Sequence, residues 1–182
     1  MDVGVIGVGV VGGACKFGFE LAGHNVLVHD IALETTIDDV LPSEVVYICV
    51  PTPRDNDGSC DISIVRQVIS ELKNKGYEGV VAIKSTVVPG TTEILRMQTG
   101  MNIIFVPEFL RERCAITDFT ENHDVCIVGC SDDKTYELIK DCHGPFPENF
   151  VRLTHDEAEF CKYFNNVYNA MLIIFANSFY EA

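Results

Sequence analysis

The feature of this chain that most limits its possible folds is a glycine-rich turn near the N-terminus. The turn follows the apolar run from Val3 to Ile6 directly, and a helical pattern begins inside it. With this spacing, the first glycine permits a tight turn, the second leaves room for a phosphate close to the backbone, and the third allows close packing of helix and strand. The N-terminal N–H groups and the dipole of such a helix attract phosphate. A turn that serves packing alone is the alternative. The predicted dinucleotide-binding turn comprises Gly7, Val8, Gly9, Val10, Val11 and Gly12.

One acidic residue, Asp30, predicts which dinucleotide this turn binds. Asp30 ends the next apolar run, Val26 to His29, and should therefore stand at the carboxyl end of a strand. A carboxylate at that place accepts hydrogen bonds from the adenosine ribose hydroxyls and repels a 2′-phosphate. No Arg or Lys occurs between Asp30 and Arg54 to receive such a phosphate. The expected cofactor is therefore NAD rather than NADP.

Composition excludes several classes of protein. With 182 residues, of which 47% are hydrophobic, the chain is long enough to bury one good-sized core. A formal net charge of −14 argues against nucleic acid as a partner, because the two would repel each other. The chain starts without a basic leader pattern, and the uncharged stretch from Val3 to Cys15 is shorter than a membrane helix requires. We therefore expect neither secretion nor membrane insertion.

The cysteine pattern agrees with a cytoplasmic location. The chain has eight cysteines but no Cys-x-x-Cys pair. Cys15, Cys49 and Cys161 lie in apolar segments, and the pair Cys126 and Cys130 falls in an apolar, strand-like run that starts at Val125. Free cysteine in such places behaves as a small hydrophobic residue. The chain is therefore interpreted as a reduced, cytoplasmic protein without a metal site.

Short apolar runs alternate with helical patterns along the chain. Strands that read as continuous Val and Ile runs, separated by helices, are typical of a parallel sheet covered on both faces. The predicted fold is an α/β, Rossmann-type, doubly wound and mostly parallel sheet that ends in a long helix. The predicted strands are 2–6, 25–29, 45–50, 79–84, 102–106, 125–129 and 150–153, and the predicted helices are 10–22, 61–74, 91–98, 132–141 and 156–181.

The last helix differs from the others. Thr154 and Glu157 have the spacing of a capping box that opens a helix. After Ala170 this helix is apolar on nearly all sides, and such a helix must be buried by something. Either a partner chain covers it, or this chain is the front part of a longer protein. Because soluble oligomers most often have two-fold symmetry, a homodimer through residues 167–182 is predicted.

Polar residues follow three of the predicted strands. Val50-Pro51-Thr52-Pro53, Ser85-Thr86 and Pro107-Glu108 each come directly after a strand, and ligands of an open parallel sheet bind at the carboxyl ends of strands. Taken singly, these could be a rigid strand exit, a turn-forming pair and a solvated acidic turn. Lys162 and Asn166, four residues apart, share one helical face. An ammonium and an amide there could hold a sugar hydroxyl and stabilise an oxyanion, although an ordinary surface pair is the alternative.

These motifs, in this order, resemble the UDP-glucose/GDP-mannose dehydrogenases. The glycine-rich turn, Val50-Pro51-Thr52-Pro53, Lys84-Ser85-Thr86-Val87, Pro107 to Glu112, and Glu159-x-x-Lys162-Tyr163-x-x-Asn166 carry the resemblance. It covers nearly the whole chain but only the N-terminal half of the family. It implies an NAD-binding domain at residues 1–155, the start of a central dimerisation helix at 156–182, and a sugar-nucleotide and cysteine domain that this sequence lacks.

The resemblance also implies roles for individual residues. The loop Val50, Pro51, Thr52 and Pro53 would line the adenine and ribose side of NAD, and Ser85 and Thr86 would lie beside the nicotinamide, with Thr86 holding a catalytic water. Glu108 would be the acid/base for hydrolysis of a thioester intermediate, and Glu112 would contact cofactor and substrate. Lys162 and Asn166 match the catalytic lysine and asparagine. The backbone lining the sugar site would be that of Glu108, Phe109, Leu110, Arg111 and Glu112.

The chain departs from the family at three further positions. Relatives carry Gly where Arg113 stands, usually a small polar residue where Cys114 stands, and tend to have Arg where Val125 stands. The predicted function is the NAD-binding portion of a nucleotide-sugar 6-dehydrogenase that takes UDP-glucose or a GDP-mannose-type sugar from alcohol to carboxylate with two NAD. A non-catalytic NAD-binding or assembly module and a small β-hydroxyacid dehydrogenase are the alternatives.

Overall fold

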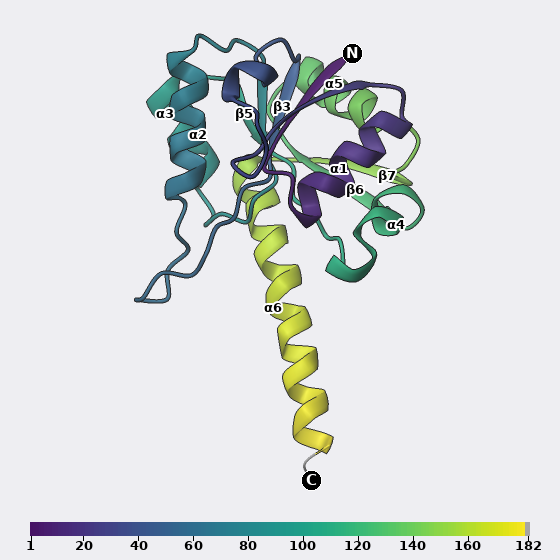
Figure 1. Cartoon of the computed structure of the whole chain (residues 1–182). Coiled ribbons are helices and arrows are strands. Elements are labelled where there is room, and N and C mark those ends of the chain that lie inside the picture. Colours follow the sequence, from purple (N-terminus) through teal and green to yellow (C-terminus); the bar gives the residue numbers. More distant parts are fainter. Residues whose placement is uncertain (181–182) are drawn as a thin grey trace.

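Within residues 1–180, which the computed structural model describes, a seven-stranded sheet lies at the centre of the molecule (Figure 1). Its strand order is β2-β1-β3-β4-β5-β6-β7. The strands are β1 (Asp2–Ile6), β2 (Asn25–His29), β3 (Val45–Ile48), β4 (Val80–Ile83), β5 (Ile103–Phe105), β6 (Val125–Gly129) and β7 (Asn149–Leu153). The helices are α1 (Val10–Leu21), α2 (Ser63–Asn74), α3 (Thr91–Thr99), α4 (Ala115–Thr120), α5 (Asp133–His143) and α6 (His155–Tyr180), with 3-10 turns η1 (Ile37–Val40) and η2 (Glu112–Cys114).

The first five strands are parallel, and the last two run the other way. Strands β1 to β5 pair in parallel, β6 meets β5 in antiparallel fashion at Phe105 and Gly129, and β7 is parallel to β6. The carboxyl ends of β1 to β5 therefore lie along one edge of the sheet, called the carboxyl edge below. The strand order changes direction between β1 and β3, which is where an open α/β sheet forms its ligand crevice. The predicted mostly parallel, doubly wound sheet is confirmed.

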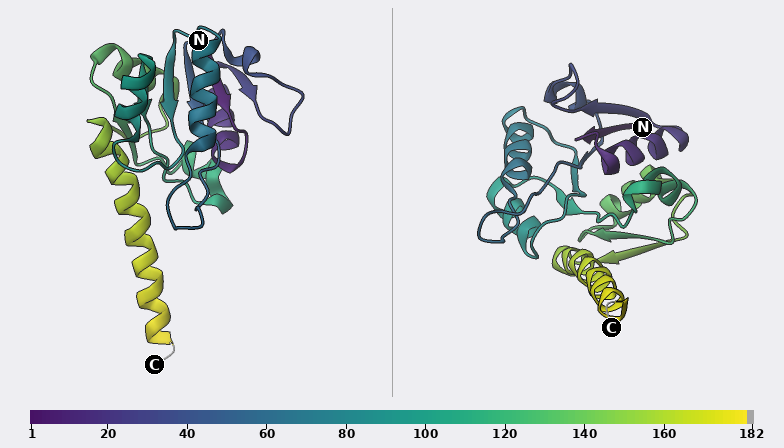
Figure 2. Two further views of the ribbon diagram at one scale, coloured as in Figure 1. Left: turned by 90° about the vertical axis from the view of Figure 1, so that its left-hand side faces the viewer. Right: turned by 60° about the horizontal axis from the view of Figure 1, so that its bottom comes forward.

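Two apolar cores lie on the two faces of the sheet because successive residues of a strand point to opposite sides. In β3, Val46 and Ile48 pack toward α2 and α3, whereas Val45 and Tyr47 pack toward α1, α4 and α5. The views in Figure 2 show helices on both sides of the strands. The cysteines at positions 15 and 126 are almost fully buried in the second core, as small hydrophobic residues would be.

Helix α6 begins beside the sheet and projects from the domain. Its first turn is fixed by the predicted capping box, in which the Thr154 N–H donates to Glu157 at 2.9 Å and the Glu157 N–H donates to the Thr154 hydroxyl at 3.3 Å. The turns up to Cys161 pack beside β6, and the remainder projects away from the body of the molecule (Figures 1 and 2). Its predicted end at residue 181 lies outside the described residues.

The remaining differences from the sequence prediction are small and local. Strands β3, β4 and β5 are shorter than predicted, and α5 continues to His143. Helix α2 begins at Ser63 rather than 61, because the Asp61 carboxylate accepts the Ser63 N–H at 2.8 Å and forms a turn there. The short elements η1, η2 and α4 were not predicted, because a segment of three to six residues is too short to show helical periodicity. Over residues 1–180, none of the helices combines the length and the hydropathy needed to span a bilayer.

Candidate cofactor and substrate site

The three glycines of the N-terminal turn differ in what surrounds them. Gly7 has a φ of +86°, which only glycine adopts freely, and a Cβ there would lie 2.9 Å from the backbone of Cys49. A Cβ on Gly12 would lie 1.8 Å from the Gly7 carbonyl oxygen, so this glycine lets α1 pack against the end of β1. No described atom lies within 4 Å of a Cβ on Gly9. Nothing in the described fold requires glycine at position 9, and the space there fits a phosphate.

The N-terminus of α1 also fits an anionic group. Gly9 is its N-cap, and among the described residues no side chain caps the helix and no acidic residue occupies its first turn. The first N–H groups of a helix lack partners within the helix and carry a partial positive charge. These donors therefore point toward the empty position beside Gly9. The strand, the turn and the uncapped helix together fit the diphosphate of a dinucleotide.

Asp30 lies at the end of β2, next to this turn. Its two carboxylate oxygens accept the N–H of Val8 at 2.6 Å and the N–H of Ala32 at 2.8 Å. The hydrogen bonds from Ala32 and Val8 lower the pKa of Asp30, so that the carboxylate is ionised at neutral pH. The side chain is thus charged and held in place beside the turn. The predicted hydrogen bonds from the ribose hydroxyls would use the lone pairs of the Asp30 carboxylate that Val8 and Ala32 leave free.

The exits of β3 and β4 are joined by Ser85. Its hydroxyl is buried and donates to the Val50 carbonyl at 2.6 Å, which links the loop after β3 to the end of β4. Ser85 therefore braces the two strand ends. Its neighbour Thr86 lines a cavity of about 390 Å³ together with Thr52, Pro53, Tyr163 and Asn166. This cavity brings the predicted residues of two strand exits together with one face of α6.

Glu108 is buried in the loop that follows β5. Its carboxylate forms an ion pair with Lys84 at 3.0 Å and accepts the N–H of Phe109 at 2.8 Å. Burial is the largest single effect and raises the pKa of Glu108, but the nearby positive charge, chiefly that of Lys84, and the hydrogen bonds to the carboxylate together outweigh burial, so the pKa is lowered. Burial is also the largest single effect on Lys84 and lowers its pKa, but the attraction to Glu108 and to three neighbouring cysteine thiols together outweighs burial, so the pKa of Lys84 is raised. Both groups of this buried pair are therefore charged at neutral pH.

Lys162 reaches the same residue from α6. Its ammonium donates to the backbone carbonyl of Glu108 and lies 5.3 Å from the centre of the Phe109 ring. Burial, together with the charge of Lys84, lowers the pKa of Lys162, and Glu108 opposes this in part. Lys162 and Glu108, two of the predicted site residues, thus meet. Asn166 does not join them at this point but lines the neighbouring cavity that contains Thr86.

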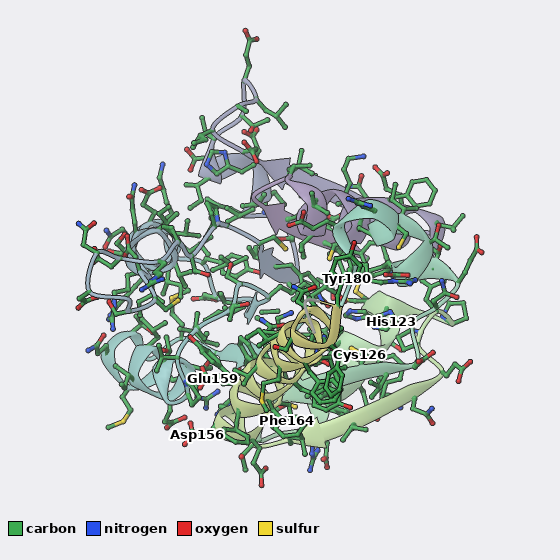
Figure 3. All side chains as sticks on the ribbon, turned by 90° about the horizontal axis from the view of Figure 1, so that it is seen from below. His123, Cys126, Asp156, Glu159, Phe164 and Tyr180 are labelled. Atoms are coloured by element: carbon green, nitrogen blue, oxygen red, sulfur yellow. The ribbon has the colours of Figure 1, made fainter. Side chains whose placement is uncertain are left out.

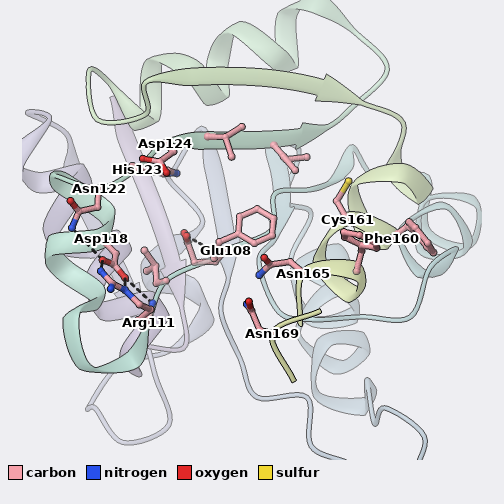
Figure 4. A pocket seen from close by; sticks show the side chains of 15 residues that line it. Glu108, Arg111, Asp118, Asn122, His123, Asp124, Phe160, Cys161, Asn165 and Asn169 are labelled. Carbon is pink, nitrogen blue, oxygen red and sulfur yellow. Dashed lines mark hydrogen bonds and ion pairs between the residues drawn. The ribbon is translucent and has the colours of Figure 1, made fainter. Parts of the chain in front are cut away.

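A larger cavity, of about 670 Å³, opens beside Glu108 (Figure 4). Predicted residues Glu108, Phe109, Leu110 and Arg111 form one wall of it. The Arg111 guanidinium is fixed by Asp118 of α4, with contacts of 2.9 and 2.6 Å. The opposite walls come from β6, from α6 and from the segment before β6. Residues there that the sequence analysis did not select include Asn122, His123, Asn165 and Asn169.

Glu112 lies apart from the four residues before it. It begins η2, is exposed, and shares a cavity of about 450 Å³ with Gly9, Val10 and Arg113. Glu112 therefore faces the glycine-rich turn rather than the large cavity. Arg113, where relatives were expected to have glycine, causes no backbone strain, because within residues 1–180 every residue with positive φ is a glycine.

The other two departures are also accommodated. The Cys114 thiol points to Asp118 at 3.6 Å, and Val125 begins β6, where it pairs with Asn149 and lines the large cavity.

Lys84 and Glu159 are the site residues whose importance appears only in the structure. Lys84 is a charged residue at the end of an apolar strand, which is the sequence signal that could have marked it. Glu159 is fully buried, and its carboxylate accepts the N–H groups of Gly90 at 2.6 Å and Thr92 at 2.8 Å. It fixes the base of α6 to the start of α3. In Figure 3, which looks onto this end of the molecule, α6 runs from Asp156 past Glu159 toward Tyr180.

The fold and this site define an NAD-binding dehydrogenase domain. The sequence model of the UDP-glucose/GDP-mannose dehydrogenase family, NAD binding domain, matches residues 32–147, which is more than half of the chain. The chain belongs to the UDP-glucose/GDP-mannose dehydrogenase family. The cofactor of the matched domain is NAD, as predicted.

Individual relatives agree with this assignment. The UDP-glucose 6-dehydrogenase of Haloferax volcanii is 32% identical over 163 residues, which cover 79% of this chain and 38% of that protein. The GDP-mannose 6-dehydrogenase of Pseudomonas aeruginosa is 26% identical, with 97% of this chain and 52% of that protein covered. The chain thus spans about half or less of the length of these relatives.

Solved structures show the same fold. The UDP-glucose dehydrogenase of Pyrobaculum islandicum superposes with a TM-score of 0.86 at 28% identity, covering 97% of this chain and 51% of the other. A 3-hydroxyisobutyrate dehydrogenase of Mycobacterium tuberculosis gives a TM-score of 0.77 at 17% identity, with 100% of this chain and 64% of the other covered. The second likeness shows a shared fold alone.

Proposed function

We propose that this chain is the NAD-binding part of a nucleotide-sugar 6-dehydrogenase. The full reaction would oxidise the alcohol of UDP-glucose, or of a GDP-mannose-type sugar, to a carboxylate while two NAD are reduced. The observation that supports this proposal most directly is the meeting of Glu108, Lys84 and Lys162 at the carboxyl edge, in a family whose domain binds NAD. Burying the charged pair of Glu108 and Lys84, with the half-buried Lys162 beside it, costs folding free energy, and such costly charge clusters are typical of functional sites.

The residues that would hold NAD lie along the carboxyl edge. The turn from Gly7 to Gly12 would receive the diphosphate, and Asp30 the adenosine ribose. The loop from Val50 to Pro53, with Ser85, Thr86 and Glu112, would line the rest of the cofactor. Bound NAD supplies a hydride acceptor at this edge.

Lys162 and Glu108 have separable roles in this proposal. The Lys162 ammonium, with the Asn166 amide on the same face of α6, stabilises the oxyanion that develops as the sugar alcohol loses its proton. The ionised Glu108 carboxylate accepts a proton from the water that hydrolyses an acyl thioester, and the Thr86 hydroxyl holds that water. Lys84 keeps Glu108 ionised in its buried position. In this proposal the cysteine that forms the thioester belongs to the other half of the enzyme.

The nucleotide sugar would enter the large cavity beside Glu108. The loop from Glu108 to Arg111 forms one wall, and the aromatic rings of Phe109, Phe160 and Phe164 provide apolar surface. The amides of Asn165 and Asn169 offer donors and acceptors for hydroxyl groups. Apolar walls with a few polar groups suit a sugar nucleotide.

The same proposal includes a homodimer through the distal part of α6, the start of a dimerisation helix that follows an NAD-binding domain at residues 1–155. Val167, Met171, Ile174, Phe175 and Phe179 are each more than half exposed. Burying one such side chain contributes roughly 1.5–3 kcal/mol, so several together favour association. Residues 181 and 182 of the predicted contact lie outside the described residues.

Light scattering tests the dimer. At tens of micromolar the chain should scatter as a dimer, and Ile174→Glu should dissociate it or make it insoluble while NAD affinity stays nearly constant. A stable monomer of the unaltered chain would refute this contact.

The catalytic proposal is tested in two steps. Calorimetry should first show that the chain binds NAD and binds NADP more weakly. The chain is then fused to the C-terminal half of the Haloferax volcanii relative, and NADH formation is followed at 340 nm with UDP-glucose. NADH should form, and Lys162→Met should abolish it, whereas Lys134→Met, remote from the carboxyl edge, should not. A fusion that binds NAD and UDP-glucose without forming NADH would support the non-catalytic module instead.

A further inference from the structure

Arg113, one of the residues that depart from the family pattern, lies close to the glycine-rich turn. The sequence alone did not predict this position. Arg113 follows Glu112 in η2, and η2 leads into α4, which lies beside α1 (Figure 1). Arg113 and Glu112 line the same cavity of about 450 Å³ as Gly9 and Val10. Arg113 therefore lines the cavity at the glycine-rich turn together with the glycine whose Cβ position is empty.

The charge of Arg113 is not used by the protein itself. Its side chain is exposed, and within residues 1–180 it makes neither an ion pair nor a hydrogen bond. Of the other cations near the carboxyl edge, Lys84 pairs with Glu108 and Arg111 with Asp118, whereas Arg54 lines a different cavity, away from the glycine-rich turn. Lys162 is directed to the carbonyl of Glu108. Arg113 is thus a cation beside the turn that remains available to a ligand.

An anionic ligand at this turn needs such a cation. The chain carries a formal net charge of −14, and Asp30 and Glu112 place carboxylates beside the same turn. The first turn of α1 contributes N–H groups and the helix dipole but no charged side chain. A diphosphate carries two negative charges, and a guanidinium binds phosphate oxygens with several parallel N–H donors.

We propose that Arg113 binds the diphosphate of the dinucleotide cofactor and supplies the local positive charge that the glycine-rich turn lacks. This inference rests on NAD binding at that turn. A nucleotide sugar also carries a diphosphate and is the other ligand that Arg113 could bind in this way. The cofactor is favoured because Arg113 shares a cavity with Gly9 and Val10, whereas Glu108 to Arg111 line a different cavity.

The test compares Arg113→Gln with Lys73→Gln. Lys73 is an exposed lysine in the last turn of α2, on the way to the amino end of β4, so its replacement changes the net charge equally but far from the site. At low salt, Arg113→Gln should weaken NAD and ADP-ribose binding about 3- to 10-fold, and Lys73→Gln should leave both unchanged. The difference should shrink as salt is raised, because exposed charges are screened. Adenosine, which has no phosphate, should bind both variants equally.

Each other outcome has a definite meaning. Equal NAD affinities for the two variants would overturn the role of Arg113 while leaving NAD binding intact. A loss of adenosine affinity as large as that of ADP-ribose would show that Arg113 only shapes the turn. A loss seen with UDP-glucose but not with ADP-ribose would assign the contact to the nucleotide sugar and overturn the proposal. An unaltered chain that binds neither NAD nor ADP-ribose would refute both this inference and the cofactor site.

Discussion

Gly9 and Gly12 are three residues apart and have opposite surroundings, which gives a matched pair of substitutions. Gly9→Ala should fold normally, because φ is −74° and no described atom lies within 4 Å of the new Cβ. It should still weaken NAD binding about tenfold or more, roughly 1.4 kcal/mol, because the methyl group occupies the phosphate position. Gly12→Ala should destabilise the fold by about 3 kcal/mol or more, since its Cβ would lie 1.8 Å from the Gly7 carbonyl oxygen.

Urea unfolding and NAD titration of both variants separate these effects. If Gly9→Ala bound NAD as tightly as the unaltered chain, the diphosphate would not lie at this turn.

Asp30 has a role in the fold as well as its proposed role in cofactor choice. Asp30→Asn should keep an acceptor for the Val8 N–H, so the turn should remain formed. Loss of the negative charge should weaken NAD binding and improve NADP binding, which raises the NADP/NAD affinity ratio by about tenfold. Asp30→Ala should do the same and, in addition, loosen the turn. Calorimetric titration of both cofactors measures the ratio, and an unchanged ratio in both variants would count against the ribose contact.

At the scale of elements, one buried carboxylate joins α6 to α3. Burial raises the pKa of Glu159, although bonds from Thr92 and Gly90 oppose this. Glu159→Ala should leave the N–H groups of Gly90 and Thr92 without their acceptor and destabilise the fold by about 2–4 kcal/mol. Lys162, one turn further along α6, should then hold Glu108 less firmly.

Urea unfolding checks the stability change. The matched control is Glu157→Ala, because the Glu157 carboxylate only closes the exposed capping box. Its expected cost is about 1 kcal/mol or less. Equal costs for the two variants would show that Glu159 does not anchor α6.

The whole molecule should lose stability on mild acidification, because it buries histidines. His143 is fully buried among aromatic rings, and burial lowers its pKa well below the ordinary value of 6.5. The unfolded chain therefore takes up a proton below about pH 6.5 that the folded chain does not. The free energy of unfolding should be level above that pH and fall below it, by up to about 1.4 kcal/mol per pH unit for this residue.

Chemical denaturation between pH 7.5 and 5.5 measures this dependence. His143→Phe keeps an aromatic ring in the cluster and removes the titrating group, so the slope should decrease. It should not vanish, because burial also lowers the pKa of His123 and His155. A slope unchanged by His143→Phe would contradict the assignment.

The sequence by itself determined the features that depend on residues close together in the chain. The order of the strands and long helices follows from apolar runs and periodicity, which are local properties. The turn at Gly7 to Gly12 needs positive φ and missing Cβ atoms at fixed spacing, and the box of Thr154 and Glu157 closes within three residues. The site residues were predicted from family motifs that directly follow strands. Because parallel strands bring their carboxyl ends to one edge of the sheet, these motifs were expected to lie close together.

Only the tertiary structure decided which distant groups became partners. Strand β6 reverses direction because the chain after β5 stays at the carboxyl edge through η2 and α4 and does not cross back. The folded arrangement of the elements also brings together three sets of polar partners. These are Lys84 with Glu108, Arg111 with Asp118, and Glu159 with the start of α3. The strength of such pairs depends on burial and on which elements become neighbours, and no local pattern encodes either. The same physics brings Arg113 of η2 and Gly9 of the glycine-rich turn to one cavity.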